Sequence, residues 1–526
     1  MEPEPISKVI RPVGPAAQFN TSRHSLGLCR SVINTCRYTV SPSGLRPQHP
    51  LKSVMENALA RVMMRHGILC AGIAGEDTNA PAFVHLETID LRRMVEWKEM
   101  PVSASDAEDG TGGPSDRWDE LLLRSLEKCH EPLWEDLAQK PGWKIVIHHD
   151  PRQLATSSAA SDGDEESTAA IALDISFAFH HAYADGKSAY VFHRSLLREL
   201  NSPTATTTPP PSLRAHTLHL PRAPVLPPPL EQLVPFTLSW TYLLRTVFRA
   251  LVPSWLKPAP PPGPWTGSPV DPSQPRCHLR LVGVPGARVP ALLARCRARG
   301  ATLTGVLHGL VLAALRARLP PDDATANTTR RRFVGSTPVS LAPYARAPVD
   351  MHCLVTSHET DFDADAVDGV WEAAARATAQ LRARAAELPR DDVVALMGYV
   401  ADWRGFLARK FGGPRDHTWE VSNVGSARFA AEGEGKGGEE GLWRIERAVF
   451  TQGANPLGAA LKINVAGVVG EGERGDGDGD SDRGGGGVWI TVGWQEGAVP
   501  ADLAEGVVGD LRRWIGVLGE GGDVVG

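Results

Sequence analysis

The chain has 526 residues, of which 42% are hydrophobic and 22% charged, and its formal net charge is −6. This length is more than one hydrophobic core usually supports, so we expect a soluble globular protein of more than one domain. The slightly acidic balance, without a basic stripe, excludes nucleic acid as the expected partner.

The cysteines and the N-terminal residues indicate the compartment. Seven cysteines are scattered along the chain and never occur as Cys-x-x-Cys. This pattern argues against a disulfide framework or a zinc knuckle and favours a reducing compartment. The N-terminal stretch "MEPEPISKVIRPVG" lacks the apolar core of a signal peptide. We therefore expect a cytoplasmic protein, and we take a monomer as its expected state.

The first 200 residues predict alternating helices and strands. Apolar residues at helical spacing predict a helix over 51–67, and a strand over 81–91 follows. A second amphipathic helix is predicted over 116–130. Two strands, over 142–149 and 168–181, are joined by a polar loop, and helical spacing resumes after Gly186. The last strand is thus followed by a turn and a helix.

Residues 201–275 are dense in proline at both ends, which predicts a semi-rigid connector between the parts 1–200 and 276–526. Inside the connector, the stretch 236–256 is apolar, but Arg245 and Arg249 near its middle would make a membrane span costly. We predict an amphipathic helix that contacts the protein body or a membrane surface, such as that of the endoplasmic reticulum or a lipid droplet.

The last part, 276–526, again mixes strands and helices. A strand over 276–284 and a helix over 289–300 precede a buried helix over 301–319, with Thr304 as its expected cap. Further strands are predicted over 331–344 and 417–425, and a hairpin over 460–470 and 488–497. The fold class is therefore α/β, with mixed α+β sheets in two halves of similar size.

The stretch from His180 to Gly186, "HHAYADG", follows an apolar run in which large residues alternate from Ile171 to Phe179. Period two places these large residues on one face of a strand. If the strand continued to the second histidine, His181 would lie on the same buried face and His180 on the opposite one.

Three interpretations of these histidines are open. His181 would serve as a general base, because imidazole has a pKa near ~6.5 and burial favours its neutral form. Asp185 would then fix the turn, and Gly186 would let a substrate approach closely. His180, His181 and Asp185 could instead bind a metal, although neighbouring strand residues point to opposite faces. A purely structural histidine is the third interpretation.

The same seven residues match the HHxxxDG motif of the condensation-domain and chloramphenicol-acetyltransferase-like acyltransferases. The chain resembles in particular the fungal alcohol acetyltransferase family, from about Arg11 to Gly497. The supporting stretches are "RPVGPAAQFNTSRHSLGL", "ATLTGVLHGLVLAAL", "STPVSLAPY", "WEVSNVG" and "VWITVGWQEG". The resemblance implies two chloramphenicol-acetyltransferase-like halves with a tunnel between them, open to an acyl thioester at one mouth and a nucleophile at the other.

The resemblance also implies a reaction. His181 would take the proton from an alcohol hydroxyl as the oxygen attacks acetyl-CoA, a co-substrate, with no bound cofactor or metal, and Asp185 would hold the turn. Alternatives are an amine acceptor, a carrier-bound donor, and an inactive homologue that only binds. A zinc hydrolase is a further class, which metal analysis would test.

Two features of the site stay open. Relatives often carry arginine in a "VSLRP" stretch where this chain has Ala342, so the partner of Asp185 or of the acyl donor is undefined, with Arg346 nearby as a weak substitute. Ser422 and Asn423 have the chemistry to stabilise an oxyanion or to bind substrate. They could equally be a polar strand end before a glycine turn.

Overall fold

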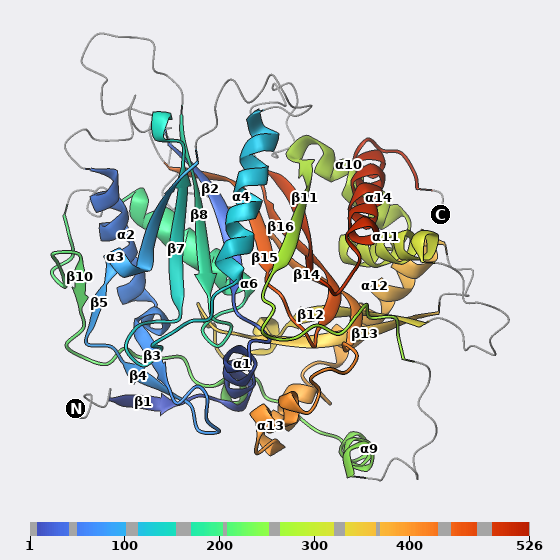
Figure 1. Cartoon of the computed structure of the whole chain (residues 1–526), viewed down its shortest axis with the longest axis horizontal. Helices are drawn as coiled ribbons and strands as arrows, with labels where there is room; N and C mark the ends of the chain where they lie inside the picture. Colours follow the sequence, from blue (N-terminus) through green and yellow to red (C-terminus); the bar gives the residue numbers. More distant parts are fainter. Residues whose placement is uncertain are drawn as a thin grey trace, which may run out of the picture.

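The protein forms two lobes that lie side by side, each built on a sheet flanked by helices (Figure 1). The first strand of the chain lies at the outer edge of one lobe, and the last helix lies on the other lobe. A computed structural model describes residues 8–40, 50–100, 114–153, 170–202, 208–251, 263–319, 332–363, 369–429, 443–470 and 486–524.

The first lobe contains a five-stranded sheet in the order β15-β2-β8-β7-β6. The strands are β2 (Val32–Val40), β6 (Val95–Glu99), β7 (Trp143–His149), β8 (Ile171–Phe179) and β15 (Arg444–Gln452). Phe177 and Phe179 of β8 join the core beneath α2 (Leu51–Arg65) and α6 (Gly186–Leu200). Ala178, between them, packs in a separate cluster with α4 (Pro114–His130). The predicted alternation along β8 is confirmed up to Phe179.

Two small antiparallel sheets flank this lobe. One comprises β1 (Val9–Pro12), β3 (Ala71–Ala74) and β4 (Ala82–His85); the other comprises β5 (Thr88–Asp90), β9 (Leu213–Arg214) and β10 (Thr217–His219). The single strand predicted over 81–91 is therefore wrong. It is divided between β4 and β5, because the two segments pair with different neighbours. α1 (Pro15–Ser25) follows β1, and α3 (Leu91–Met94) follows β5.

The second lobe contains a six-stranded mixed sheet in the order β11-β17-β16-β14-β12-β13. The strands are β11 (Cys277–Pro285), β12 (Arg332–Ser340), β13 (Val355–Asp363), β14 (His417–Ala427), β16 (Ala459–Val468) and β17 (Gly487–Gln495). Its helices are α10 (Val289–Ala298), α11 (Leu303–Arg318), α12 (Val370–Glu387) and α14 (Ala501–Gly519), and their buried residues share one core with the sheet. The predicted hairpin is confirmed as the antiparallel pair β16–β17.

β15 belongs to the first lobe's sheet although it lies far along the chain. It pairs antiparallel with β2, and it is flanked in sequence by β14 and β16 of the other sheet. The first lobe therefore needs residues from both sides of the connector. The division into 1–200, 201–275 and 276–526 stays a prediction about segments of the chain. It is not a description of the two sheets.

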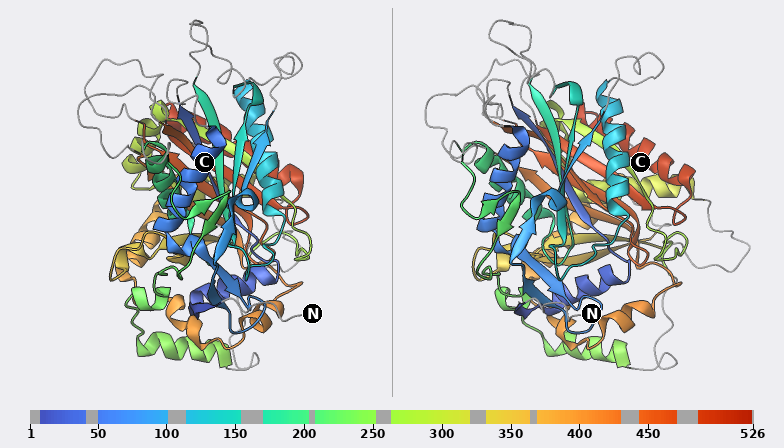
Figure 2. Two further views of the ribbon diagram at one scale, coloured as in Figure 1. Left: turned by 90° about the vertical axis from the view of Figure 1, so that its left-hand side faces the viewer. Right: turned by 60° about the vertical axis from the view of Figure 1, so that its left-hand side comes forward.

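The connector packs on the second lobe before it reaches an amphipathic helix. Leu230 and Leu233 of α8 (Leu230–Leu233) lie in a cluster with Leu341, Leu354 and Leu388. The helix predicted over 236–256 is observed as α9 (Trp240–Leu251), and residues 252–256 lie outside the described residues. Figure 2 shows α9 (green) at the lower edge of the molecule in both views.

Among the described residues, no single helix has both the length and the apolar composition to cross a membrane. One pair of segments, Gly286–Ala298 and Leu303–Arg318, meets that test only when taken together, and the two are bent by 81°.

Candidate active site

The HHxxxDG stretch forms the turn between β8 and α6. β8 ends at Phe179, so the prediction that the strand reaches His181 is wrong. His180 closes the turn: its Nδ1 accepts the Ala182 N–H at 2.9 Å, and its carbonyl accepts the Tyr183 N–H at 3.0 Å. These two bonds bend the chain away from the sheet. The two imidazoles point to different surroundings because of this turn, and not because of strand alternation.

His181 has one ring nitrogen committed to the backbone. Its Nδ1–H donates to the Ala184 carbonyl at 3.0 Å, which leaves the lone pair on Nε2. Burial lowers the pKa of His181, Arg23 lowers it further, and Asp185 opposes the shift. The ring is therefore neutral at cell pH, half-buried and next to a cavity. This is the protonation state that a general base requires.

The cavity beside His181 has a volume of about 390 Å³ and is lined from both lobes. α1 and the motif turn contribute one wall, and β12, β13 and β14 contribute the other. The motif contributes His181, Asp185 and Gly186 to the lining, followed by Lys187, and α1 contributes residues that include Phe19, Asn20 and Arg23. Cys353, whose Sγ lies 3.5 Å from His181 Nδ1, lines it as well.

Asp185 holds the turn through backbone amides. It caps α6, with Oδ1 accepting the Ser188 N–H at 2.8 Å, and Oδ2 accepts the Leu354 N–H of the second lobe at 3.0 Å. The exposed Arg346 makes no such bond with it among the described residues. Ala342, which begins a short 3-10 helix, therefore leaves no vacancy beside Asp185. The carboxylate joins the two lobes next to His181.

Replacing Asp185 with alanine should lower both stability and turnover. Two buried N–H groups lose their acceptor at a cost of about 1–3 kcal/mol each, and α6 loses its cap. Asp185→Asn keeps the acceptor for Ser188 but turns an N–H donor toward the Leu354 N–H. Its melting temperature should therefore lie between those of wild type and Asp185→Ala. Thermal melts and kcat for the three proteins check this order. A wild-type melting temperature for Asp185→Ala would contradict it.

Gly186 is required by packing rather than by backbone conformation. A Cβ at this position would lie 2.3 Å from Val424 Cγ1 and 3.2 Å from the Phe450 ring. α6 therefore begins in close contact with β14 and β15. The sequence-based interpretation, that glycine allows close approach, applies here to two strands of the protein itself.

The two oxyanion candidates lie on opposite faces of β14. Asn423 donates from Nδ2 to Thr304 Oγ1 of α11 at 3.1 Å and accepts the Gly425 N–H at 2.9 Å, so its amide is directed toward the helices. Ser422 is the preceding residue of the strand, so its side chain lies on the opposite face, which it shares with Glu420. Glu420 accepts a hydrogen bond from the Gln452 amide. Both Ser422 and Asn423 contribute to the cavity lining. Ser422 is therefore the better oxyanion candidate.

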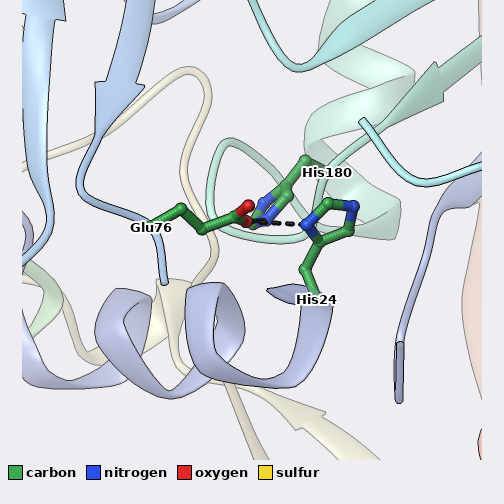
Figure 3. Close-up of side chains that lie close together, drawn as sticks. All are labelled: His24, Glu76 and His180. Atoms are coloured by element: carbon green, nitrogen blue, oxygen red, sulfur yellow. Dashed lines mark hydrogen bonds and ion pairs between the residues drawn. The ribbon is translucent and has the colours of Figure 1, made fainter. Parts of the chain in front are cut away.

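His180 belongs to a cluster that the sequence did not indicate. Glu76, in the turn between β3 and β4, accepts His180 Nε2–H at 2.7 Å and His24 Nδ1–H at 2.7 Å, both on Oε1 (Figure 3). Burial would raise the pKa of Glu76, but the hydrogen bonds and the electrostatic interactions with His180 and His24 together outweigh it and lower that pKa to about 2. Burial lowers the pKa of His180 to about 4.

The three ligand atoms lie within 4.8 Å of one another, a spacing that a metal site also has. However, the other nitrogen of each ring accepts a backbone N–H: His180 Nδ1 from Ala182 at 2.9 Å, and His24 Nε2 from Trp134 at 3.0 Å. A metal on the nitrogens that face Glu76 would force hydrogens onto these acceptors, against two N–H donors. With a hydrogen on each ring nitrogen that faces Glu76, every donor and acceptor named here has a hydrogen-bond partner. With a metal in their place, the backbone N–H groups of Ala182 and Trp134 would lose their acceptors.

Sequence reasoning missed His24 and Glu76 for different reasons. His24 lies within "RPVGPAAQFNTSRHSLGL", a stretch used only to support the resemblance, and it occupies the last turn of α1. Glu76 stands in a polar turn without periodicity or motif. Only the fold brings these positions to His180.

Comparisons with known proteins agree with the motif. No protein-family model matches the chain. The chain is 29% identical to the probable alcohol acetyltransferase FCK4 of Fusarium pseudograminearum, over 98% of this chain and 96% of that relative. It is 25% identical to the probable alcohol acetyltransferase crmB of Aspergillus fumigatus, over 86% of this chain and 91% of that relative.

Solved structures show the fold. The TRI3 trichothecene 15-O-acetyltransferase of Fusarium sporotrichioides has a TM-score of 0.61 at 12% identity, covering 97% of this chain and 94% of that one. The first condensation domain of the CDA synthetase has a TM-score of 0.52 at 14% identity, with 98% of each chain covered. The recognition made from the HHxxxDG motif is confirmed: the chain is similar over most of its length to fungal proteins named as probable alcohol acetyltransferases, and it has the two-lobed fold of the solved acetyltransferase and condensation-domain structures.

Proposed function

We propose that the protein transfers an acetyl group from acetyl-CoA to an alcohol hydroxyl, with both substrates bound together in the cavity. The observation that carries this proposal is the hydrogen bond from His181 Nδ1–H to the Ala184 carbonyl, which leaves Nε2 unprotonated beside the cavity. The names of the two fungal relatives support an alcohol as the acceptor and acetyl as the transferred group.

The reaction needs one base and one oxyanion donor. His181 Nε2 takes the proton of the acceptor hydroxyl as its oxygen attacks the thioester carbonyl carbon. The carbonyl electrons move onto oxygen, where the Ser422 hydroxyl of the same cavity stabilises the charge. The carbon–oxygen double bond then re-forms, the carbon–sulfur bond breaks, and the imidazolium returns its proton to the departing thiolate. The ester and CoA are the products.

The lowered pKa of His181 suits this role. Its neutral form predominates over a wider pH range than that of a solvent-exposed imidazole, so the base is present at the pH of the cytosol. Asp185 contributes indirectly. It fixes the motif turn through the Ser188 N–H, and it fixes the start of β13 in the second lobe through the Leu354 N–H.

The experiment is incubation of the full chain with acetyl-CoA and pooled alcohols and amines, followed by assays of free CoA and of product masses. New acetyl esters at matching CoA release would support the proposal. Acetamides would favour an amine acceptor. CoA release without an acylated product would indicate hydrolysis. No turnover of acetyl-CoA, but turnover of an acetylated carrier protein, would indicate a carrier-bound donor, and no turnover of either would indicate a binding homologue.

A further inference from the structure

Large apolar side chains are exposed at one end of the molecule. Most of those exposed among the described residues lie on α9, on the 3-10 helix η7 (Val393–Tyr399), and on or just after α13 (Trp403–Ala408). Figures 1 and 2 place α9 and α13 at the same lower end. We call this surface the α9–η7–α13 face; its exposed apolar residues are Trp240, Leu244, Phe248, Val393, Tyr399, Phe406 and Phe411.

α9 presents its apolar stripe to solvent. Trp240, Leu244 and Phe248 follow one another at intervals of four, so they share a face of the helix, and they are 78%, 64% and 52% exposed. The helix start is fixed to the body, because the Ser239 N–H donates to Asp391 Oδ1 at 2.6 Å and the Ser239 hydroxyl to Oδ2 at 2.8 Å. An amphipathic helix ordinarily buries such a stripe, and here it is held outward.

The same face contains an opening of the cavity. Val393 and Phe406 are exposed and also line the cavity that holds His181. Met397 and Leu407, from the same two elements, line it as well. An apolar molecule that left an apolar surface at this face would therefore enter the cavity without crossing bulk water.

The charges of the face are complementary to an anionic surface. Arg245 on α9, Arg390 before η7 and Arg409 at the end of α13 are exposed, and Lys410 lies beside them. The neighbouring carboxylates are bound within the protein: Asp391 binds Ser239 and pairs with Arg390 at 3.5 Å, Asp402 caps α13 through the Gly405 N–H, and Asp416 pairs with Lys410. Basic residues around exposed aromatic and aliphatic side chains suit the surface of a bilayer with anionic lipids.

We infer that the α9–η7–α13 face docks on an anionic lipid surface and that the acceptor is an apolar alcohol drawn from that surface into the cavity. This inference rests on the proposed acetyl transfer for the nature of the acceptor. The docking itself does not depend on it.

The test uses the full chain in co-sedimentation with phosphatidylcholine vesicles, with or without phosphatidylserine. The variant Trp240→Asp/Leu244→Asp/Phe248→Asp removes the apolar stripe without touching a residue of the cavity lining. Val225→Asp is the matched control, because Val225 is a 92% exposed apolar residue on the connector outside this face. We expect wild type and the control to bind vesicles that contain phosphatidylserine, and the triple variant to bind at least about tenfold more weakly.

Activity separates docking from catalysis. With a short, water-soluble alcohol, the triple variant should match wild type. With a long-chain alcohol embedded in vesicles, its rate should fall by about the same factor as its binding. Absence of wild-type binding, equal binding by the triple variant, or a wild-type dimer that the triple variant converts to a monomer would overturn the inference. If no alcohol is acetylated, the proposed function is wrong, and vesicle binding still tests the docking by itself.

A second inference comes from the bridge in Figure 3. Two buried imidazoles from α1 and the motif turn donate to one oxygen of Glu76. α1 also holds the turn through Asn20, whose Nδ2 lies 3.4 Å from the His181 carbonyl, and α1 forms one wall of the cavity. Glu76 therefore fixes the wall and the turn that carry the base relative to each other.

We propose that Glu76 is a positioning residue for His181. Glu76→Ala leaves two buried N–H donors without an acceptor, so α1 and the turn should shift, and kcat should fall by about 10–100-fold with little change in the KM for acetyl-CoA. Glu76→Gln keeps the accepting oxygen and should restore kcat to within about threefold of wild type.

A spectroscopic measurement distinguishes the bridge from metal ligation or a purely structural role. One-dimensional proton spectra should show low-field imidazole N–H signals in wild type and Glu76→Gln that are absent in Glu76→Ala. If Glu76→Ala does not fold, the wild-type and Glu76→Gln spectra and rates still decide the matter. Bound metal with no such signals, equal losses in both variants, or unchanged kcat in a destabilised Glu76→Ala would overturn the proposal.

Discussion

His181→Ala is expected to lower kcat by on the order of 10²–10⁴-fold, because it removes the proposed general base and little else. His181 is half-buried at the cavity, and its backbone partner, the Ala184 carbonyl, can be hydrated there once the ring is gone. The melting temperature should therefore change little. Steady-state rates with acetyl-CoA and the best alcohol, together with thermal melts, check both parts.

Two further substitutions serve as controls. His181→Asn keeps an N–H donor for the Ala184 carbonyl but has no base, so it should be as inactive as His181→Ala. His180→Ala removes a bridge member and should lower the melting temperature, with a smaller loss of rate. Equal rate losses at His180 and His181, accompanied by loss of a bound metal, would contradict the base assignment and indicate a metal site.

The pH profile carries the same information. Because burial and Arg23 lower the pKa of His181, the acid limb of kcat/KM should lie below the ~6.5 of an ordinary imidazole. An acid limb above that value would mean that another group titrates.

Unfolding on acidification is the second large expected effect. Burial lowers the pKa of five histidines in the folded protein: to about 3 for His130 and His308, and to about 4 for His148, His180 and His193. The unfolded chain binds these protons near pH ~6.5. The stability is therefore fully present above that pH and is lost as the pH falls from there toward 4, by roughly 1 kcal/mol per pH unit for each histidine.

Urea or thermal unfolding between pH 8 and pH 5 measures this loss, as a steep fall in stability below about pH 6.5. His308→Gln is the matched control. Glutamine retains a donor for Thr337 and an acceptor for the Trp419 indole N–H, but it binds no proton. Its slope against pH should be smaller by one histidine's share. A flat stability between pH 7.5 and pH 5 would contradict the prediction.

The sequence predicted the elements whose signal is local. Alternation along β8, helical spacing after Gly186 and the β16–β17 hairpin all depend on neighbouring residues, and these predictions are confirmed. The cap of α11 shows the limit of local reasoning. Thr302, not Thr304, accepts the Gly305 N–H at 3.2 Å, and Thr304 instead binds Asn423 of β14. Both threonines fit a cap, and a tertiary contact decides between them.

The same difference between local and long-range signals applies to the candidate site. His181 and Asp185 lie in one heptad, so the motif found them. Asp185 and His180 have local partners in Ser188 and Ala182, but their long-range partners are Leu354, Glu76 and, through Glu76, His24, which are far from the motif in sequence. Two of those partners act through a carboxylate oxygen and an imidazole, and the third through a backbone amide. No pattern along the chain marks a backbone amide as the partner of a carboxylate.

The crossover of β15 limits how the enzyme can open. β15 pairs with β2 in one sheet, while its Phe450 carbonyl accepts the Thr491 hydroxyl at 2.7 Å and its Gln452 amide donates to Glu420 and Asn464 in the other. A rotation that separated the lobes would have to break these bonds to the second sheet, or else pull β15 away and expose the unpaired edge of β2. We therefore expect substrates and products to exchange through local movements of short segments that line the cavity, such as η7 and α13. Where such a movement limits turnover, we expect it to be that of these segments and not of a hinge between the lobes.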